Sequence, residues 1–100
     1  MKFILNVTVP NKEFNAAVED GSAGAKLEKI LASIEPESVY FTTHDGQRGA
    51  TLVVNLENAS EIPKVAEPWF LTFNAKIEIK LVMSPEDLAK SGLEDIGKLW

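Results

Sequence analysis

His44 is the only histidine in the chain, and its neighbours make it the first candidate for proton transfer. Tyr40 lies four residues before it, and Asp45 and Arg48 follow it closely. A histidine beside a carboxylate and a tyrosine can act as a general acid or base. The structural alternative, a solvated histidine at the tip of a hairpin, is favoured here. A catalytic His44 would have to face a cavity that it shares with Tyr40.

Other polar side chains offer less chemistry. Lys76, Glu78 and Lys80 alternate along one face of an expected strand, where they could bind an acidic substrate. Such rows more often hydrate an outward face or pair with neighbouring strands. The chain has no cysteine, which excludes thiolate catalysis and disulfides. With one histidine and scattered carboxylates, neither a metal site nor a cofactor is expected.

A small-molecule pocket is expected between the first helical segment and the sheet. Its predicted lining residues are Phe14, Val18, Phe41 and Trp69. Simple core packing is the structural alternative for the aromatic residues among them. An entirely apolar pocket would favour binding without chemistry.

Length and charge restrict the class of protein. One hundred residues form a single domain, residues 1–100, with one modest core. A net charge of −5 argues against nucleic acid, because phosphate binding needs clustered Lys and Arg, and against an anionic membrane surface. The composition is that of a soluble protein, and the lack of cysteine fits a cytoplasmic location.

Hydrophobic periodicity predicts the elements that position these residues. Alternation predicts strands at 2–9, 38–44, 50–56 and 75–83, and helical spacing predicts helices within 12–34 and after Ser60 and Ser84. A break is expected near 21–24, where two glycines disturb the first helical stretch. The residues 45–49 are expected to form a hairpin turn.

Capping and proline signals predict where these helices begin and end. Asn11, Ser60 and Ser84 are expected to be N-caps, and Gly92 a C-cap. Pro68 is expected to end the regular part of its helix, because proline cannot donate the required hydrogen bond.

The order strand–helix–strand–strand–helix–strand predicts an α+β, ferredoxin-like fold. Its antiparallel sheet would have the strand order 4-1-3-2, with two helices on one face and a helical tail at 85–100. The opposite face would be mixed, with Ile4 and Val53 among polar residues such as Asn6 and Thr8. We interpret this face as a homodimer interface rather than a solvated surface, because the apolar tail also needs a surface to pack on.

The second half of the chain resembles the muconolactone isomerase-like group of the dimeric α/β-barrel superfamily. The motifs that carry the resemblance are the glycine-led strand 49–56, the acid-Asn-Ala-Ser helix start 57–62, Pro68-Trp69-Phe70, and the strand 77–81 that enters an acidic helix. The resemblance implies a dimeric α/β barrel with paired sheets and exchanged C-terminal segments. It also implies that a cofactor-free isomerase or monooxygenase is an alternative to a binding protein.

Three functions therefore remain open at the level of sequence. The first is a small-molecule-binding dimer that lacks catalysis. The second is a cofactor-free enzyme that acts on a small aromatic or lactone-like compound. The third is a structural or interaction module, which a filled core without a pocket would favour.

Overall fold

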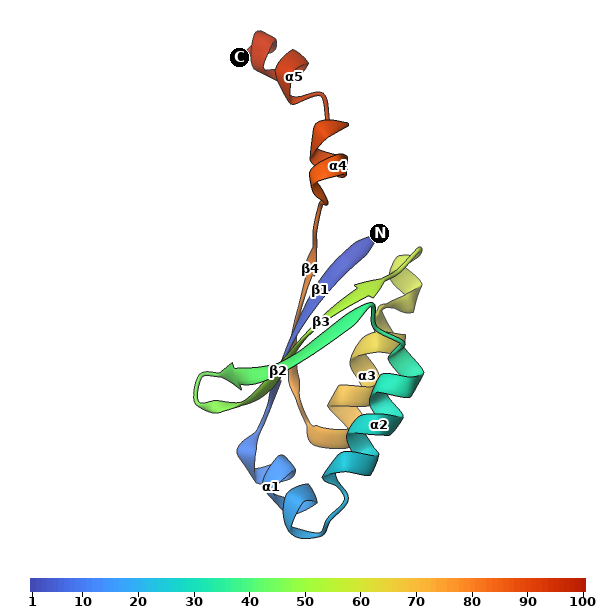
Figure 1. Ribbon diagram of the computed structural model, residues 1–100, viewed down its shortest axis with the longest axis vertical. Coiled ribbons are helices and arrows are strands. Elements are labelled where there is room, and N and C mark those ends of the chain that lie inside the picture. The colour runs from blue at the N-terminus through green and yellow to red at the C-terminus, as the bar shows by residue number, and fades with distance from the viewer.

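A computed structural model describes all 100 residues of the chain and places ten elements along it (Figure 1). They are β1 (Lys2–Val9), α1 (Asn11–Glu19), α2 (Ala23–Ile34), β2 (Ser38–His44), β3 (Gln47–Asn55), the 3₁₀ turn η1 (Ala59–Glu61), α3 (Ile62–Phe73), β4 (Lys76–Leu81), α4 (Pro85–Ala89) and α5 (Leu93–Leu99). No helix is both long and apolar enough to cross a bilayer.

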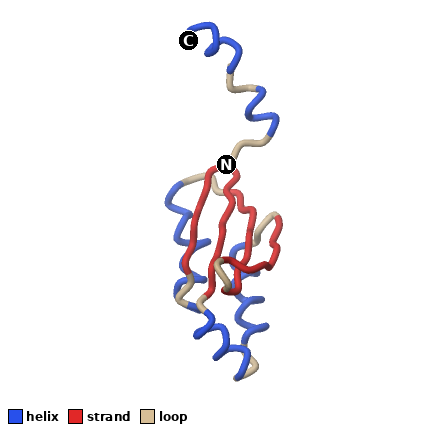
Figure 2. Tube along the Cα trace, turned by 90° about the vertical axis from the view of Figure 1, so that its left-hand side faces the viewer, coloured by secondary structure: helices blue, strands red, loops and turns tan.

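The four strands form one antiparallel sheet in the order β2-β3-β1-β4. This order confirms the predicted α+β, ferredoxin-like arrangement. Helices α2 and α3 lie side by side along the same face of the sheet (Figure 1), and Figure 2 shows the four strands next to one another. The other face carries no helix of this chain and is called the open face below.

The core lies between the sheet and α2 and α3, as the alternation of the strands requires. Leu5 and Val7 of β1 and Leu52 of β3 are completely buried, because every second residue of a strand points to the same face. Trp69 and Phe73 of α3 are also completely buried, one helical turn apart. These large side chains hold α3 against the sheet.

The predicted break in the first helical stretch is present. Helix α1 ends at Glu19 and α2 begins at Ala23, and Gly21 between them has a φ of 81° that favours glycine. Two predicted N-caps were wrong. Helix α1 begins at Asn11 itself, with Pro10 at the N-cap. Asn58 rather than Ser60 caps the turn η1, because the Glu61 carboxylate accepts the backbone N–H of Asn58 at 3.1 Å.

Pro68 does not end α3, contrary to the sequence expectation. The helix continues through it to Phe73. The cost is one backbone hydrogen bond, which Lys64 would otherwise accept. Lys64 is exposed, so water can reach this part of the helix. The burial of Trp69 and Phe73 beyond the proline outweighs that loss.

The hairpin between β2 and β3 is tighter than expected. Asp45 and Gly46 alone form the turn, with positive φ angles of 51° and 74°, and His44 pairs with Gln47. Positive φ at both central residues is typical of the two-residue hairpin turn that Asp-Gly favours. Strand β3 therefore begins at Gln47, and Arg48 becomes part of the sheet.

The C-terminal tail, residues 85–100, projects away from the body of the protein (Figures 1 and 2). The chain measures 60 Å along its longest axis, and its radius of gyration is 16.9 Å. A compact domain of this length has a radius of gyration of about 13 Å. Every residue of α4 and α5 is exposed, so the tail packs on no part of its own chain.

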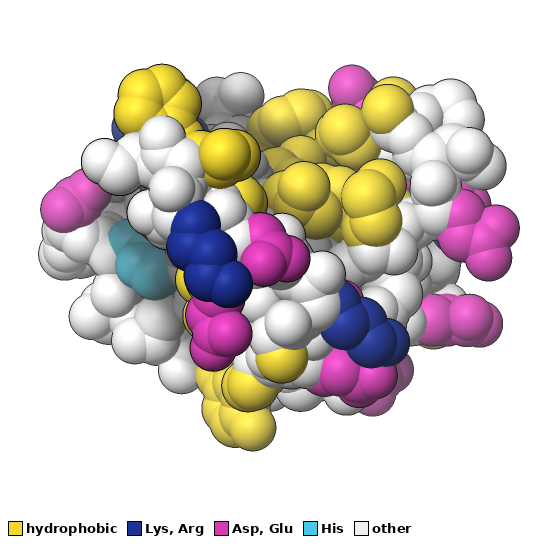
Figure 3. All heavy atoms as spheres, turned by 90° about the horizontal axis from the view of Figure 1, so that it is seen from above, with side chains coloured by type: hydrophobic (Ala, Val, Ile, Leu, Met, Phe, Trp, Pro, Cys, Tyr) yellow, Lys and Arg dark blue, Asp and Glu magenta, His cyan; other side chains and the backbone are white.

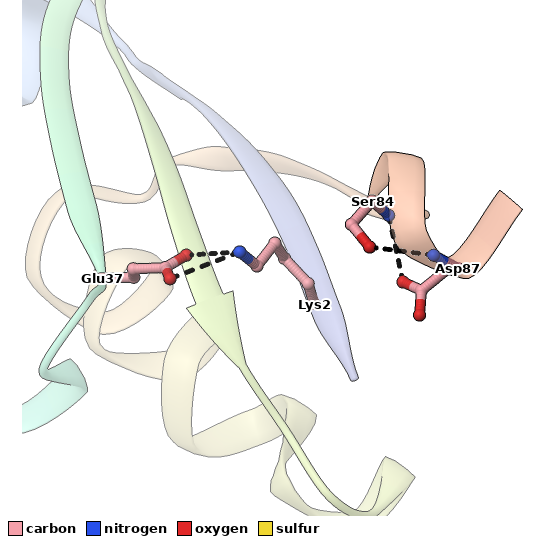
Figure 4. Close-up of polar contacts among 4 residues, drawn as sticks. All are labelled: Lys2, Glu37, Ser84 and Asp87. Carbon is pink, nitrogen blue, oxygen red and sulfur yellow. Dashed lines mark hydrogen bonds and ion pairs between the residues drawn. The ribbon is translucent and has the colours of Figure 1, made fainter. Parts of the chain in front are cut away.

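Two short helices make up this tail. Ser84 caps α4 as predicted, since its hydroxyl accepts the backbone N–H of Asp87 at 3.1 Å and its own N–H donates to the Asp87 carboxylate at 3.0 Å (Figure 4). Lys90 rather than Gly92 is the C-cap of α4, and Gly92, with a φ of 77°, precedes α5. Nearby, Lys2 and Glu37 form an ion pair at 3.0 Å (Figure 4).

Candidate functional site

An apolar cavity of about 280 Å³ lies between the sheet and the helices. We call it the helix-side cavity. Six of its nine lining residues are hydrophobic. The nine are Val9, Phe14, Leu27, Phe41, Thr42, Arg48, Gly49, Ala50 and Trp69.

Strand register brings the sheet side of this cavity together. Phe41 pairs with Ala50, and Ala50 pairs in turn with Val7, so these residues share the face that the helices cover. Phe41 lies on the edge strand β2 and is 58% exposed, which leaves the cavity open to solvent on that side. The absence of a large side chain at Ala50 contributes to the space beside it.

Helices α1, α2 and α3 each supply part of the remaining wall. Phe14 of α1 packs on Phe73 of α3, with their ring centroids 5.2 Å apart. Leu27 comes from α2, and Trp69 comes from α3. This arrangement fixes the aromatic groups in place, because the Trp69 and Phe73 side chains are completely buried.

Arg48 is the charged residue of the helix-side cavity. Its Nη1 donates to the Asn15 Oδ1 at 2.7 Å, and its Cζ lies 4.9 Å from the centroid of the Phe14 ring. The side chain is therefore held by a hydrogen bond and by a cation–π contact. A second contact joins the same two elements, since the Asn11 backbone N–H donates to Gln47 Oε1 at 3.3 Å.

The Trp69 indole lies beside the cavity and is completely buried. Its Nε1 is buried and has no hydrogen-bond acceptor. Buried polar groups of native proteins are nearly always paired, so an unpaired indole N–H calls for a physical explanation.

The predicted pocket residues divide into two groups. Phe14, Phe41 and Trp69 line the helix-side cavity, but Val18 does not, and it is 51% exposed. Ala17 is the buried residue in this part of α1, so the helix turns its neighbour outward. Sequence reasoning missed Arg48 as a lining residue, because it treated residues 45–49 as a turn.

A second cavity, of about 350 Å³, lies on the open face and has no hydrophobic lining residue. We call it the open-face cavity. Its lining residues are Asn6, Thr8, Thr43, His44, Asp45, Lys76 and Glu78. The strand pairs Thr8–Lys76 and Asn6–Glu78 place two residues of the charged row beside β1 in this cavity.

His44 therefore faces the open-face cavity, while Tyr40 lines neither cavity and is 69% exposed. The imidazole packs against Gly49, where even a Cβ would collide with it. The Nε2 of His44 is buried and has no partner. Gly49 also lines the helix-side cavity, so the two cavities approach each other at this residue.

Three carboxyl groups have a lowered pKa, and none lines either cavity. Backbone N–H groups of Asn58 and Glu57 lower the pKa of Glu61, and Ser22, whose backbone N–H donates to Asp20 Oδ1 at 2.8 Å, lowers the pKa of Asp20. The Ser84 backbone N–H, followed by its side chain, lowers the pKa of Asp87. These shifts belong to turns and helix caps. No group of three or more His, Cys, Asp or Glu residues is arranged to hold a metal ion.

Comparison with known proteins identifies the fold and leaves the family open. No family model matches the chain, and no curated protein matches it. One similar solved structure is the 5-chloro-2-hydroxyhydroquinone dehydrochlorinase TftG from Burkholderia phenoliruptrix AC1100, in complex with 2,5-dihydroxybenzoquinone. It is 17% identical, with a TM-score of 0.54, and the alignment covers 86% of this chain and 97% of that one.

A second similar structure is a de novo designed protein, Ferredog-Diesel. It is 9% identical, with a TM-score of 0.46, and 81% of this chain and 85% of that chain are covered. At such identities the likeness to the dehydrochlorinase shows the shared ferredoxin-like fold.

Proposed function

We propose that this chain binds a small apolar or aromatic molecule in the helix-side cavity. The observation that carries this proposal is a cavity of about 280 Å³ in which six of nine lining residues are hydrophobic. An apolar cavity of about 150 Å³ in a protein core holds benzene, so the larger volume suits one or two aromatic rings. The dehydrochlorinase of the same fold, in complex with a one-ring quinone, supports this size of ligand.

A ¹⁵N-HSQC titration with naphthalene tests the proposal. Amide signals of residues around Phe14, Phe41 and Trp69 should shift together and saturate. Phe41→Ala should weaken binding, because Phe41 lines the cavity at its exposed side. Val18→Ala is the matched control, since Val18 is an exposed apolar residue outside the cavity. No shifts with naphthalene would contradict the proposal and favour a structural or interaction module.

We further propose that the protein is a homodimer, joined through the open face and the C-terminal tail. Only 15 of 100 residues are buried in the single chain, and the large apolar residues of the tail are all exposed. Viewed from above, exposed hydrophobic side chains gather in a broad patch with acidic and basic side chains beside it (Figure 3). An apolar centre with a polar rim is typical of specific protein interfaces. Pairing of two open faces would give a dimeric α/β barrel.

The resemblance of residues 49–88 to the muconolactone isomerase-like group supports membership in that group. The lack of cysteine supports the proposal of a cytoplasmic location. The resemblance also supports a second candidate function, a cofactor-free isomerase in which His44 acts without the expected Tyr40, because Tyr40 lines neither cavity. The favouring observation is that His44 lines a polar cavity together with Asp45 and Glu78. Isomerisation of α-angelica lactone, followed by NMR in wild type and His44→Gln, tests this candidate. Equal rates in both proteins would remove His44 as an acid or base.

A further inference from the structure

We infer that the ligand of the helix-side cavity is an aromatic anion, with its acidic oxygen group bound by Arg48. This inference rests on the proposed function and specifies the chemical class of its ligand. It is carried by a cation that is held in place, belongs to no ion pair of the protein and lines an apolar cavity.

Arg48 is the only arginine of the chain, and none of the ion pairs of the protein includes it. The protein has 15 carboxylate side chains and a net charge of −5. A guanidinium stays charged at all physiological pH values and carries five N–H donors. The Arg48 side chain donates one hydrogen bond within the protein, to Asn15. The remaining donors are therefore free for an anion that enters the cavity.

The position of Arg48 is fixed before a ligand binds. Asn15 holds Nη1 at 2.7 Å, and the Phe14 ring lies 4.9 Å from Cζ. Preorganisation lowers the entropic cost of forming new hydrogen bonds, and a planar guanidinium matches a carboxylate in two parallel contacts. The apolar walls formed by Phe14, Leu27 and Phe41 select a ring for the rest of the ligand.

Trp69 closes the wall of the cavity on the side of α3. Its side chain is completely buried, so no atom of the indole, its unpaired Nε1–H included, is exposed to a ligand. Arg48 is therefore the charged donor that an anionic ligand can reach.

Two probes of similar ring size, naphthalene and 2-naphthoate, separate this inference from the proposed function. Isothermal titration calorimetry at pH 7 on the full chain should give an affinity for 2-naphthoate at least about tenfold higher than for naphthalene, the lower end expected for a charge-assisted hydrogen bond. Arg48→Gln should abolish that ratio. Lys12→Gln should preserve it, because Lys12 is an exposed cation of α1 outside the cavity.

If naphthalene binds and 2-naphthoate binds no better, or if Arg48→Gln leaves the ratio unchanged, the inference is overturned and the proposed function stands. If neither compound binds, the proposed function fails, and this inference fails with it.

Discussion

Deletion of residues 85–100 is expected to weaken the proposed dimer, because this tail exposes more apolar surface than its own chain can cover. Leu88, Leu93 and Ile96 are 44%, 56% and 47% exposed, and Leu99 and Trp100 are 81% and 100% exposed. Together these fractions correspond to about three fully exposed large side chains, each of which contributes roughly 1.5–3 kcal/mol when buried.

The contribution of each tail to the free energy of dimerisation is the gain from burial less the cost of ordering its side chains. Docking of one tail on the partner subunit would contribute roughly 5–10 kcal/mol from burial, and ordering its five large side chains would cost about 0.5–1.5 kcal/mol each. A net contribution of roughly 2–3 kcal/mol for each tail remains. Because a symmetric dimer has two tails, their deletion should raise the dimer Kd by roughly 1,000- to 10,000-fold.

Sedimentation velocity at micromolar concentration measures this change. The wild type should sediment as a dimer of about 22 kDa, twice the chain mass of 11.0 kDa. A Lys90→Ala, Lys98→Ala double variant is the matched control, since it alters the tail and keeps its apolar residues. A truncated chain with the same dimer Kd and melting temperature as the wild type would refute the reasoning, because the tail would then contact nothing.

Three substitutions test finer features of the fold. Gly49→Ala should lower the free energy of unfolding by about 1–3 kcal/mol in chemical denaturation. Its Cβ would collide with the His44 ring and lie 2.8 Å from the Val7 carbonyl oxygen. An unchanged denaturation midpoint would contradict the tight packing at this position. Gly24→Ala should instead stabilise by about 0.5–1 kcal/mol, since it lies within α2 with open space around it, and a loss of stability would argue against that environment. The lowered pKa of Asp87 means that its cap stabilises α4 at neutral pH and that this contribution is lost as the pH falls below about 4. Asp87→Asn should remove this part of the pH profile of helical circular dichroism, and identical profiles would show that the cap has no such role.

The strands and their order could be predicted because they depend on local alternation. Leu5, Val7 and Leu52 recur with a period of two, and each points to the face that the helices cover. Helix ends were harder to predict. Pro68 is a local signal for a helix end. Helix α3 nevertheless continues past it, because the burial of Trp69 and Phe73 stabilises the remaining turn. That burial depends on the sheet beneath α3, which no local signal describes.

The candidate site was predicted only in part for the same reason. Aromatic residues such as Phe14 and Trp69 can be recognised as pocket or core residues from type and helical spacing. The role of Arg48 depends on the two-residue turn, which extends β3 to Gln47 and puts Arg48 on the helix-covered face. Its contact with Asn15 joins residues 33 positions apart, and periodicity cannot detect such a pair.

The sequence by itself determined the ferredoxin-like order of elements, the apolar faces of the strands and the caps with strong local signals, such as Ser84. Only the tertiary structure decided that His44 and Arg48 belong to different cavities on opposite faces of one hairpin. The physical reason is that a strand alternates its side chains, so the register set by the turn assigns each residue to a face. The positions of the helices then decide which of those faces encloses a cavity, through contacts between residues far apart in the chain.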